Sequence, residues 1–340
     1  MSRGLSIVSA MILFAFVSAA SGCSSISNPT LTSHRVAASI RETPQSLGSW
    51  TTKASMPTAR DELAVGDING ILYAVGGCAE LFCSGPLNTV EAYDPATDVW
   101  VSKAPMPTAR RGLAVGVING ILYAAGGFGG NINSIGDENC CELDTVEAYD
   151  PATDTWTAKA PMPTARGFVA AGVINGILYV VGGRSGNGFV STLEAYNPAT
   201  NSWTTLQSMP SARWGLAASV VNGKLYALGG YNAHGTLNKV DAYDPATNTW
   251  KVRASMPAAR KYLTSGVIRG RLYAVGGFDR AYLTTVEAYD SVTNTWTTKT
   301  PMPTKRAGLA AGVVQGILYA VGGYHSRLWG MGTVEAFNPR

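Results

Sequence analysis

The chain has 340 residues, of which 46% are hydrophobic and 14% are charged. This composition excludes a disordered protein, because the chain has enough apolar residues to bury a large core. The formal net charge of +4 comes from 26 basic and 22 acidic residues spread along the chain. Without a basic run or a basic helix, the sequence gives no indication of nucleic acid as a partner.

The first 46 residues have the features of an export signal and a tether. Residues 1–22 carry one cation, Arg3, before an apolar stretch that is too short to span a bilayer, which is typical of a cleaved signal peptide. The tetrapeptide Ala-Ser-Gly-Cys that ends at Cys23 resembles a bacterial lipobox. This resemblance implies a lipid on Cys23 and an exported protein held at a membrane, in the periplasm or at the cell surface. The alternative is ordinary signal-peptidase cleavage nearby, with Cys23 left as a thiol. Residues 23–46, rich in Ser and Thr, are interpreted as a flexible tether.

From residue 47 to residue 340 the sequence repeats one unit six times. Each unit has a Trp, then Met-Pro, two residues, Arg, an apolar run, Leu-Tyr and Gly-Gly. The distance from the Trp to the second Gly is always 27 residues, as from Trp50 to Gly77. The repeated tryptophans are Trp50, Trp100, Trp156, Trp203, Trp250 and Trp296. A repeat this regular predicts one structural unit stacked on its own copies, with the tryptophans as scaffold.

Each unit is predicted to be a four-stranded antiparallel meander. In the second unit, the apolar run 112–118 is followed by Asn119-Gly120, a two-residue turn that requires positive φ, and then by the run 121–125. A third strand is expected over 145–149, and a fourth begins at Trp156 after an Asp-Pro-Ala-Thr turn.

The repeats resemble the Kelch motif, and six copies imply an all-β, six-bladed propeller. The chain ends after a third strand, while Trp50 opens a fourth-type strand with no third strand before it. We therefore expect the segment from about Trp50 to Ser55 to complete the last blade and to close the ring.

The variable loops of the six repeats are predicted to lie on one face. The distance from the second Gly to the third-strand acid ranges from 10 to 20 residues, whereas the distance from that acid to the next Trp is constant. The strand-2-to-strand-3 connection lies on the same face as the Met-Pro-x-x-Arg link. This loop face is the expected binding face, because insertions confined to one face of a repeat array commonly mark it.

Two sets of residues are candidates for binding on the loop face. One Arg per blade predicts a ring of guanidinium groups that could hold an anion. The alternative is that each Arg pairs with a third-strand acid and is structural. The ring consists of Arg60, Arg110, Arg166, Arg213, Arg260 and Arg306. Residues that vary between repeats, after Gly-Gly or after the Arg, form the second set, since the resemblance to peptide-binding Kelch domains implies contacts there. These are Phe128, Arg184, Trp214, Tyr231, Tyr262, Phe278 and Tyr324, with Lys261 beside them.

Four cysteines fall in the two longest loops. In an exported protein, Cys78, Cys83, Cys140 and Cys141 are predicted to form two disulfides of unknown connectivity, and we prefer this to a metal site.

Two enzyme families built on Kelch propellers provide alternatives to binding. A galactose oxidase type of copper site is disfavoured, because His234 and His325 are the only histidines of the repeats. A resemblance to periplasmic sugar mutarotases would need only an acid/base pair, for which Asp61, Glu62, Asp279 and His325 are candidates.

We therefore expect a non-catalytic binding scaffold at the cell envelope, without cofactor or metal. Its loop face would recognise a protein or glycan partner, and its only membrane contact would be the lipid anchor. We expect a monomer. The alternative function is a sugar mutarotase or isomerase that uses the central mouth. Near-identical repeats favour recognition, because an active site normally needs several unlike residues that converge on one point.

Overall fold

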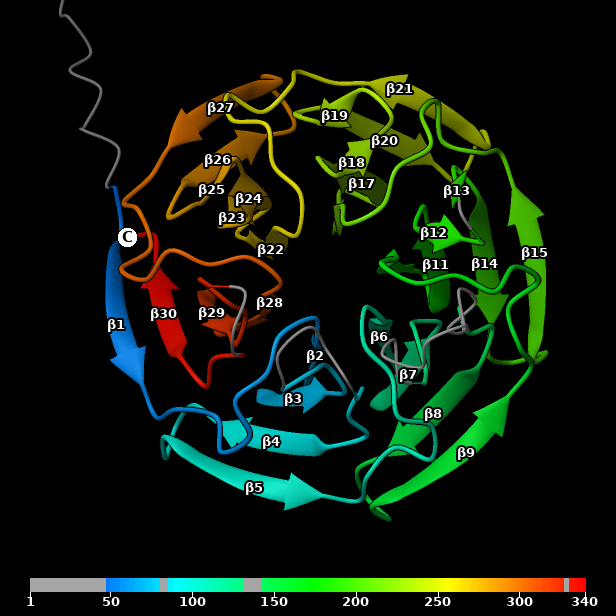
Figure 1. The fold of residues 1–340 in the computed structure, drawn as a ribbon. Coiled ribbons are helices and arrows are strands. Elements are labelled where there is room, and N and C mark those ends of the chain that lie inside the picture. The colour runs from blue at the N-terminus through cyan, green and yellow to red at the C-terminus, as the bar shows by residue number, and fades with distance from the viewer. Residues whose placement is uncertain (1–46, 80–84, 131–141, 187, 327–329) are drawn as a thin grey trace, which may run out of the picture. The chain divides into compact units, whose positions relative to one another are not determined.

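The computed structural model describes residues 47–79, 85–130, 142–186, 188–326 and 330–340. Six four-stranded antiparallel sheets are arranged in a ring around a central channel (Figure 1), which confirms the predicted six-bladed propeller. Within the described part of the chain, no helix is long and apolar enough to cross a membrane. The lipid anchor at Cys23 lies outside the described residues and stays a prediction.

The first three blades each take their strands in chain order, from the channel outwards. Blade 1 contains β2 (Ala64–Ile68), β3 (Ile71–Val75), β4 (Val90–Asp94) and β5 (Val99–Lys103). Blade 2 contains β6 (Ala114–Ile118), β7 (Ile121–Ala125), β8 (Val146–Asp150) and β9 (Thr155–Lys159). Blade 3 contains β10 (Ala170–Ile174), β11 (Ile177–Val181), β14 (Leu193–Asn197) and β15 (Ser202–Leu206).

The next two blades repeat this order, and the last blade combines both ends of the chain. Blade 4 contains β16 (Ala217–Val221), β17 (Lys224–Leu228), β20 (Val240–Asp244) and β21 (Thr249–Val252). Blade 5 contains β22 (Thr264–Ile268), β23 (Arg271–Val275), β26 (Val286–Asp290) and β27 (Thr295–Thr298). Blade 6 contains β28 (Ala310–Val314), β29 (Ile317–Val321), β30 (Val334–Asn338) and β1 (Ser49–Lys53).

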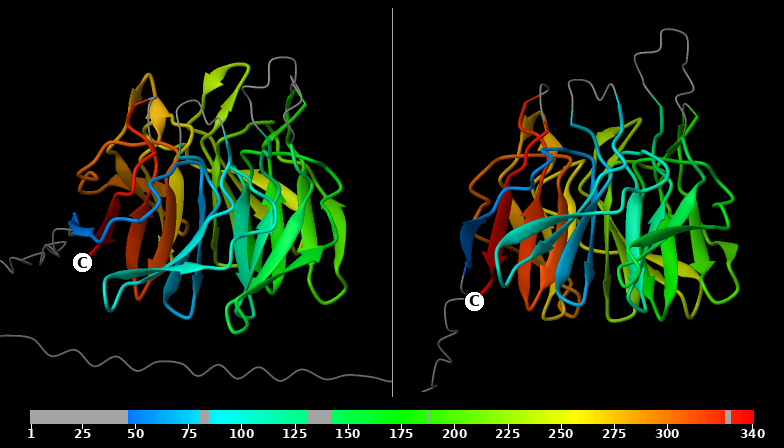
Figure 2. Two further views of the ribbon diagram at one scale, coloured as in Figure 1. Left: turned by 60° about the horizontal axis from the view of Figure 1, so that its bottom comes forward. Right: turned by 90° about the horizontal axis from the view of Figure 1, so that it is seen from below.

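Three short hairpins stand on the loop face of blades 3, 4 and 5 (Figure 2). They are β12 (Arg184–Ser185) with β13 (Gly188–Phe189), β18 (Tyr231–Asn232) with β19 (Gly235–Thr236), and β24 (Phe278–Asp279) with β25 (Ala281–Tyr282).

The N-terminal strand closes the ring as the sequence predicts. β1 pairs antiparallel with β30 along its whole length, from Ser49 opposite Asn338 to Lys53 opposite Val334. The last blade is therefore held by hydrogen bonds between segments almost 300 residues apart in the chain, so the sheet edges that an open array would expose are paired.

The inner hairpins adopt the turn that their sequences require. Asn119 and Gly120 have φ of 52° and 79°, both in the left-handed region that a type I′ turn needs. The same conformation occurs at Arg269 (50°) and Gln315 (50°), where the sequence keeps only the glycine. The fixed repeat length thus outweighs the local preference of Arg and Gln for negative φ.

Neighbouring blades are joined by a repeated Trp, Tyr and Asp or Asn. In blade 1, the Trp100 indole N–H donates to the Ala54 carbonyl of blade 6 at 2.9 Å. The Tyr93 hydroxyl donates to Asp98, which also accepts from the Ala54 backbone N–H. The repeated tryptophans are half-buried, so their exposed fraction is larger than that of a core residue. The ring of Trp100 packs on Tyr93, with 5.0 Å between the ring centroids. They are scaffold, as predicted, and their polar edge links one blade to the next.

Blade 6 keeps the Trp bond, since the Trp50 indole N–H donates to the Thr300 carbonyl at 3.0 Å, but it lacks the Tyr and Asp part. Its connection from strand 3 to strand 4 is the break between the chain ends. Phe337 occupies the Tyr position and is fully buried. A Cβ added to Gly48 would lie 2.4 Å from the tip of the Phe337 ring, so the ring takes the space that a side chain at position 48 would need. The Thr300 backbone N–H donates to the Leu47 carbonyl in place of an Asp or Asn side chain. The one Phe in this series thus stands where the acceptor for a Tyr hydroxyl is missing.

Candidate functional site at the channel mouth

The variable loops and the Met-Pro-x-x-Arg links meet on one face, as the loop lengths predict. In each blade the residue after the Arg forms a β-bridge with the residue after Gly-Gly, for example Arg111 with Phe128 and Trp214 with Tyr231. The loops and hairpins project from this face, while the opposite face carries short turns (Figure 2).

The six blade arginines are buried beneath the loop face. Each has 0% relative exposure and forms an ion pair with the third-strand acid of its own blade. In blade 2, an Arg110 guanidinium nitrogen lies 2.6 Å from Glu147, and another donates to the Thr145 carbonyl at 2.7 Å. Burial lowers the pKa of Arg110 to about 10, against the opposing effect of Glu147, so Arg110 stays charged at neutral pH. Each Arg is thus buried and paired with an acid of its own blade, as expected for a structural role, and the six arginines are not part of the proposed binding surface.

The Thr of the repeated Pro-Thr segment completes the ion pair. The Thr108 hydroxyl donates to one oxygen of Glu147 at 2.8 Å, and the same bond occurs in blades 1, 3 and 6. Blade 5 has Ala258 at this position. Burial raises the pKa of Glu287 there, opposed chiefly by Arg260. The near-identical repeats therefore encode a buried network of ion pairs and hydrogen bonds, in which the Nε atoms of five of the six arginines have no hydrogen-bond partner among the described residues.

A ring of backbone hydrogen bonds surrounds the channel at the loop face. We call its six residues the collar; each lies two positions after a blade Arg. They are Glu62, Gly112, Phe168, Gly215, Tyr262 and Gly308. Each collar N–H donates to the carbonyl of the collar residue in the preceding blade, with N to O distances from 2.7 to 3.2 Å. The ring is closed, so the collar fixes the position of every side chain it carries.

Large residues and glycines alternate around the collar. All six residues have positive φ, including Phe168 at 51° and Tyr262 at 53°. Bulky residues in this region are rare and strained, at a cost of about 1–3 kcal/mol each. The glycines make room for neighbouring rings, since a Cβ on Gly112 would lie 2.8 Å from Phe168. Strain held at alternate positions of one ring is typical of a functional site.

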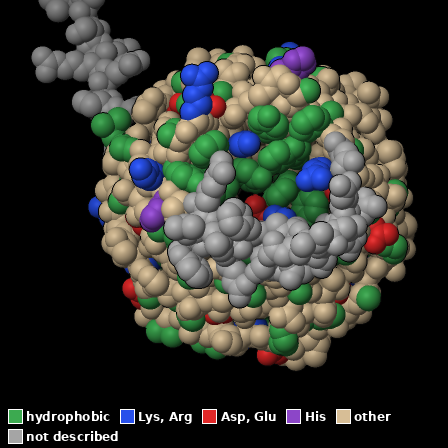
Figure 3. Space-filling view, in the orientation of Figure 1, with side chains coloured by type: hydrophobic (Ala, Val, Ile, Leu, Met, Phe, Trp, Pro, Cys, Tyr) green, Lys and Arg blue, Asp and Glu red, His purple; other side chains and the backbone are tan. Residues whose placement is uncertain are grey.

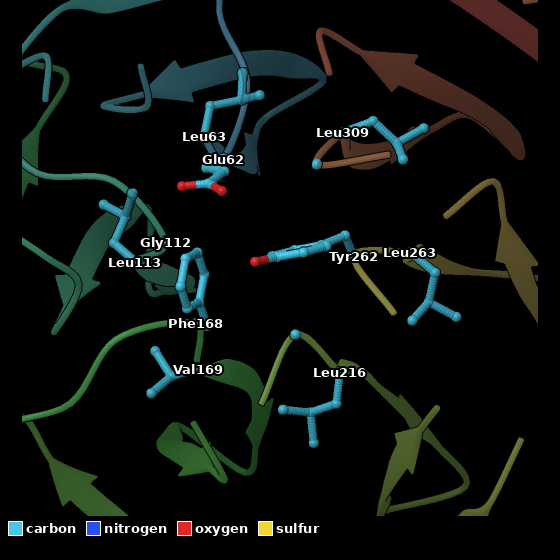
Figure 4. A pocket seen from close by; sticks show the side chains of 12 residues that line it. Glu62, Leu63, Gly112, Leu113, Phe168, Val169, Leu216, Tyr262, Leu263 and Leu309 are labelled. Atoms are coloured by element: carbon cyan, nitrogen blue, oxygen red, sulfur yellow. The ribbon is translucent and has the colours of Figure 1, made fainter. Parts of the chain in front are cut away.

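The large collar side chains point towards the centre of the mouth (Figure 4). Glu62, Phe168 and Tyr262 line a cavity of about 80 Å³ together with a deeper ring of five leucines and Val169. Below that ring the channel has a volume of about 170 Å³ and is lined mainly by Ala, Val and Leu. The mouth is thus a shallow site above a channel that is lined mainly by small side chains.

Aromatic rings form a continuous cluster around the collar, which we call the aromatic mouth. Its members are Phe128, Phe168, Trp214, Tyr231, Tyr262, Phe278, Tyr282 and Tyr324. The ring centroids of Phe168 and Trp214 are 5.3 Å apart, and those of Trp214 and Tyr231 are 5.4 Å apart. Phe128 is buried, while Trp214 and Tyr231 are half-buried. The loop face has a hollow at its centre that is lined by hydrophobic side chains with cations around it (Figure 3).

Two neighbouring acids, Asp61 and Glu62, lie at the mouth with one cation, Arg111. Arg111 of blade 2 lies 2.5 Å from Glu62 of blade 1, and its guanidinium also stacks over Phe128 and Phe168. Burial, and then the charge of Glu62, raise the pKa of Asp61 to about 8, although Arg111 opposes the shift. The mouth therefore holds Asp61, whose neutral form is favoured by burial, beside an ion-paired Glu62.

Lys261 lies among four aromatic rings on the other side of the mouth. Its Nζ is 4.1 Å from the centroid of Tyr231 and 5.1 Å from that of Trp214, with the rings of Tyr262 and Phe278 within 6 Å. Desolvation lowers the pKa of Lys261, and Asp279 opposes this effect. The ammonium group therefore makes cation–π contacts with four aromatic rings.

The remaining candidates lie at the edge of the mouth or outside the described residues. Arg184 is 41% exposed, and its Nε is 3.8 Å from Glu142. His325 is exposed, whereas Asp61 and Glu62 are half-buried. Cys78 is buried and disulfide-bonded. Cys83, Cys140 and Cys141 lie outside the described residues, so their pairing stays a prediction. No group of three metal-ligating side chains occurs in the described ranges.

Sequence reasoning missed three members of this site. Phe168, Arg111 and Tyr282 were not among the candidates. Phe168 had a usable signal, because glycine occupies its equivalent position in every second repeat. Arg111 directly follows a blade Arg and has no counterpart in the neighbouring repeats.

Two family models match the chain over most of the propeller. Residues 60–107 and 109–163 each match the Kelch motif, and residues 158–323 match the KLHDC2/KLHL20/DRC7 Kelch-repeats domain. The chain is a Kelch-repeat propeller protein. The solved structure of YjhT is similar to this Kelch propeller, with a TM-score of 0.69 and 19% identity over 82% of this chain and 94% of the other. At that identity the likeness concerns the fold alone.

Curated relatives match single repeats of the Kelch propeller. The influenza virus NS1A-binding protein homolog of Mus musculus is 52% identical over 50 residues, which are 15% of this chain and 8% of that protein. Kelch-like protein 1 of Mus musculus is 45% identical over 49 residues, 14% of this chain and 6% of that protein. The chain thus matches less than a tenth of the length of either relative.

Proposed function

We propose that this Kelch propeller is a non-catalytic binding scaffold that seats a protein or glycan partner on its loop face. We further propose that it works at the cell envelope, exported and held by a lipid on Cys23. The observation that carries the binding role is the aromatic mouth, a continuous cluster of rings at the centre of the elaborated face. Kelch propellers commonly serve as binding scaffolds, which supports this assignment.

The chemistry of the mouth suits recognition. Aromatic and cationic side chains that are partly desolvated make up most binding hot spots. Trp214 and Tyr231 offer rigid ring faces that lose little entropy on binding, because the collar and the hairpins already hold them. A sugar ring or an apolar side chain can stack on such faces, while Asp61 and Glu62 offer polar atoms on the other side of the mouth.

A glycan and peptide array probed with the purified protein tests this proposal. We expect a ligand whose binding falls at least tenfold in Trp214→Ala, since truncation of a hot-spot residue costs more than about 1 kcal/mol and often above 2 kcal/mol. Val101→Ala, on the exposed outer strand of blade 1, is the matched control and should bind normally. Binding that is lost in neither variant would remove the aromatic mouth as the site.

One observation favours a second function, a sugar mutarotase or isomerase. Burial raises the pKa of Asp61, which favours its neutral acid form, while its neighbour Glu62 is ion-paired to Arg111, so two carboxyl groups in unlike environments adjoin in the mouth. Such a pair can donate a proton to one oxygen of a cyclic sugar and accept one from another. Anomer exchange followed by NMR, accelerated by the protein and slowed in Asp61→Asn, would establish this function in place of the scaffold.

A further inference from the structure

Lys261 differs from Arg111 and Arg184 in its interaction partners, which are aromatic rings and not a carboxylate. Arg111 is 2.5 Å from Glu62, and Arg184 is 3.8 Å from Glu142. Among the described residues, no carboxylate lies within ion-pair distance of the Lys261 ammonium, although Asp279 acts on it from further away. Its four close neighbours are aromatic ring faces.

Ring faces attract a cation without neutralising it. A carboxylate partner would cancel the charge of Lys261, whereas the ring quadrupoles leave its full positive charge in place. The surrounding rings also exclude water, and in such a medium an added anion is attracted more strongly than in bulk solvent. A positively charged group that is partly desolvated and has no carboxylate within ion-pair distance can therefore accept an anionic group.

The net charge of the mouth at neutral pH supports the same conclusion. Glu62 is balanced by Arg111, and burial raises the pKa of Asp61, which favours its neutral form. Lys261 has no ion-paired carboxylate among the described residues and lies beside the ring faces of Trp214 and Tyr231, which are the surfaces on which a ligand would stack.

We propose that Lys261 is the specificity-determining residue of the mouth and selects ligands that carry a carboxylate over neutral ligands of the same shape. The ligand body lies on Trp214 and Tyr231, and its carboxylate accepts hydrogen bonds from the ammonium group. This inference rests on the proposed binding function. It names the charge that the ligand must carry at that site.

Matched pairs of small probes test the inference on the purified full chain. Glucuronate is compared with glucose, and N-acetyl-glutamate methylamide with N-acetyl-glutamine methylamide, by calorimetry or saturation-transfer NMR. We expect the acidic member of at least one pair to bind about tenfold more tightly, because a charge-assisted hydrogen bond is about twice as strong as a neutral one. The pair that shows the preference identifies a sugar acid or an acidic amino acid as the source of the carboxylate. The preference should weaken at high ionic strength.

Three variants make the result specific. Lys261→Gln should remove the preference for the acidic probe, and Lys261→Arg should retain much of it. Lys251→Gln, on the exposed outer strand of blade 4, should leave it unchanged. Equal binding of acidic and neutral probes, no binding of any probe, or a preference that survives Lys261→Gln would overturn the inference. The proposed binding function would still stand if the array ligand depends on Trp214.

Discussion

The Ala258→Thr variant tests whether a Thr hydroxyl stabilises the buried Arg–Glu ion pair of a blade. In four blades a Thr hydroxyl donates to an oxygen of the buried Glu at 2.7 to 2.8 Å. Blade 5 lacks this donor, and burial raises the pKa of Glu287 there. Because the backbone repeats from blade to blade, a Thr at position 258 should place its hydroxyl against Glu287.

The expected gain is about 1 kcal/mol in the free energy of unfolding. A hydrogen bond to a charged group contributes about 1.5–3 kcal/mol, and ordering the side chain offsets part of it. For a domain of this size, that gain corresponds to a rise in Tm of about 1–2 °C. A raised pKa means that folding disfavours the charged form of Glu287, so the new bond should stabilise at pH 7 and have little effect near pH 3, where Glu287 is protonated in both states.

Chemical denaturation and calorimetry measure the effect, with Thr108→Ala as the matched control. This control removes the same bond from blade 2 and should cost about 1 kcal/mol. If Thr108→Ala destabilises the protein while Ala258→Thr leaves Tm unchanged at neutral pH, the equivalence of the blades on which the reasoning depends is refuted.

Three further variants test the closure, the missing hydroxyl and the acid of the mouth. Deletion of residues 47–56 removes β1 from blade 6 and should abolish the cooperative thermal transition; a truncated protein that melts as before would disprove the closure. Phe337→Tyr should destabilise the fold by about 1–3 kcal/mol in denaturant titrations, because the new hydroxyl would be buried where Gly48 replaces the Asp or Asn acceptor of the other blades. The folded state holds a proton on Asp61 between its unfolded pKa near 4 and about 8, so stability should fall as pH rises through this window. Asp61→Asn should flatten that decline in Tm measured against pH, and an unchanged profile would contradict the shift.

The fold could be predicted from the sequence because the repeat is uninterrupted where the structure is rigid. The fixed spacing from Trp50 to Gly77 and its copies fixes strand lengths and turn type, and the unequal ends of the chain predict how the ring closes. Even Phe337 has a sequence explanation, since it lies where the strand-3-to-strand-4 turn is broken.

The site could be predicted only in part, because the repeat pattern does not say which way a side chain points. Arg110 and its equivalents were candidates for the surface and for pairing, and only coordinates place them at 0% exposure beside their acids. Trp214 and Tyr231 were predicted from their variability between repeats. The pairing of Arg111 with Glu62 depends on contact between two blades, which no spacing within one repeat reveals.

The location of a bound ligand tests the central claim most directly. A crystal structure of the protein with the strongest ligand from the array should show that ligand on the ring faces of Trp214 and Tyr231, above the collar. A ligand bound to the outer strands or to the turns of the opposite face would contradict the account.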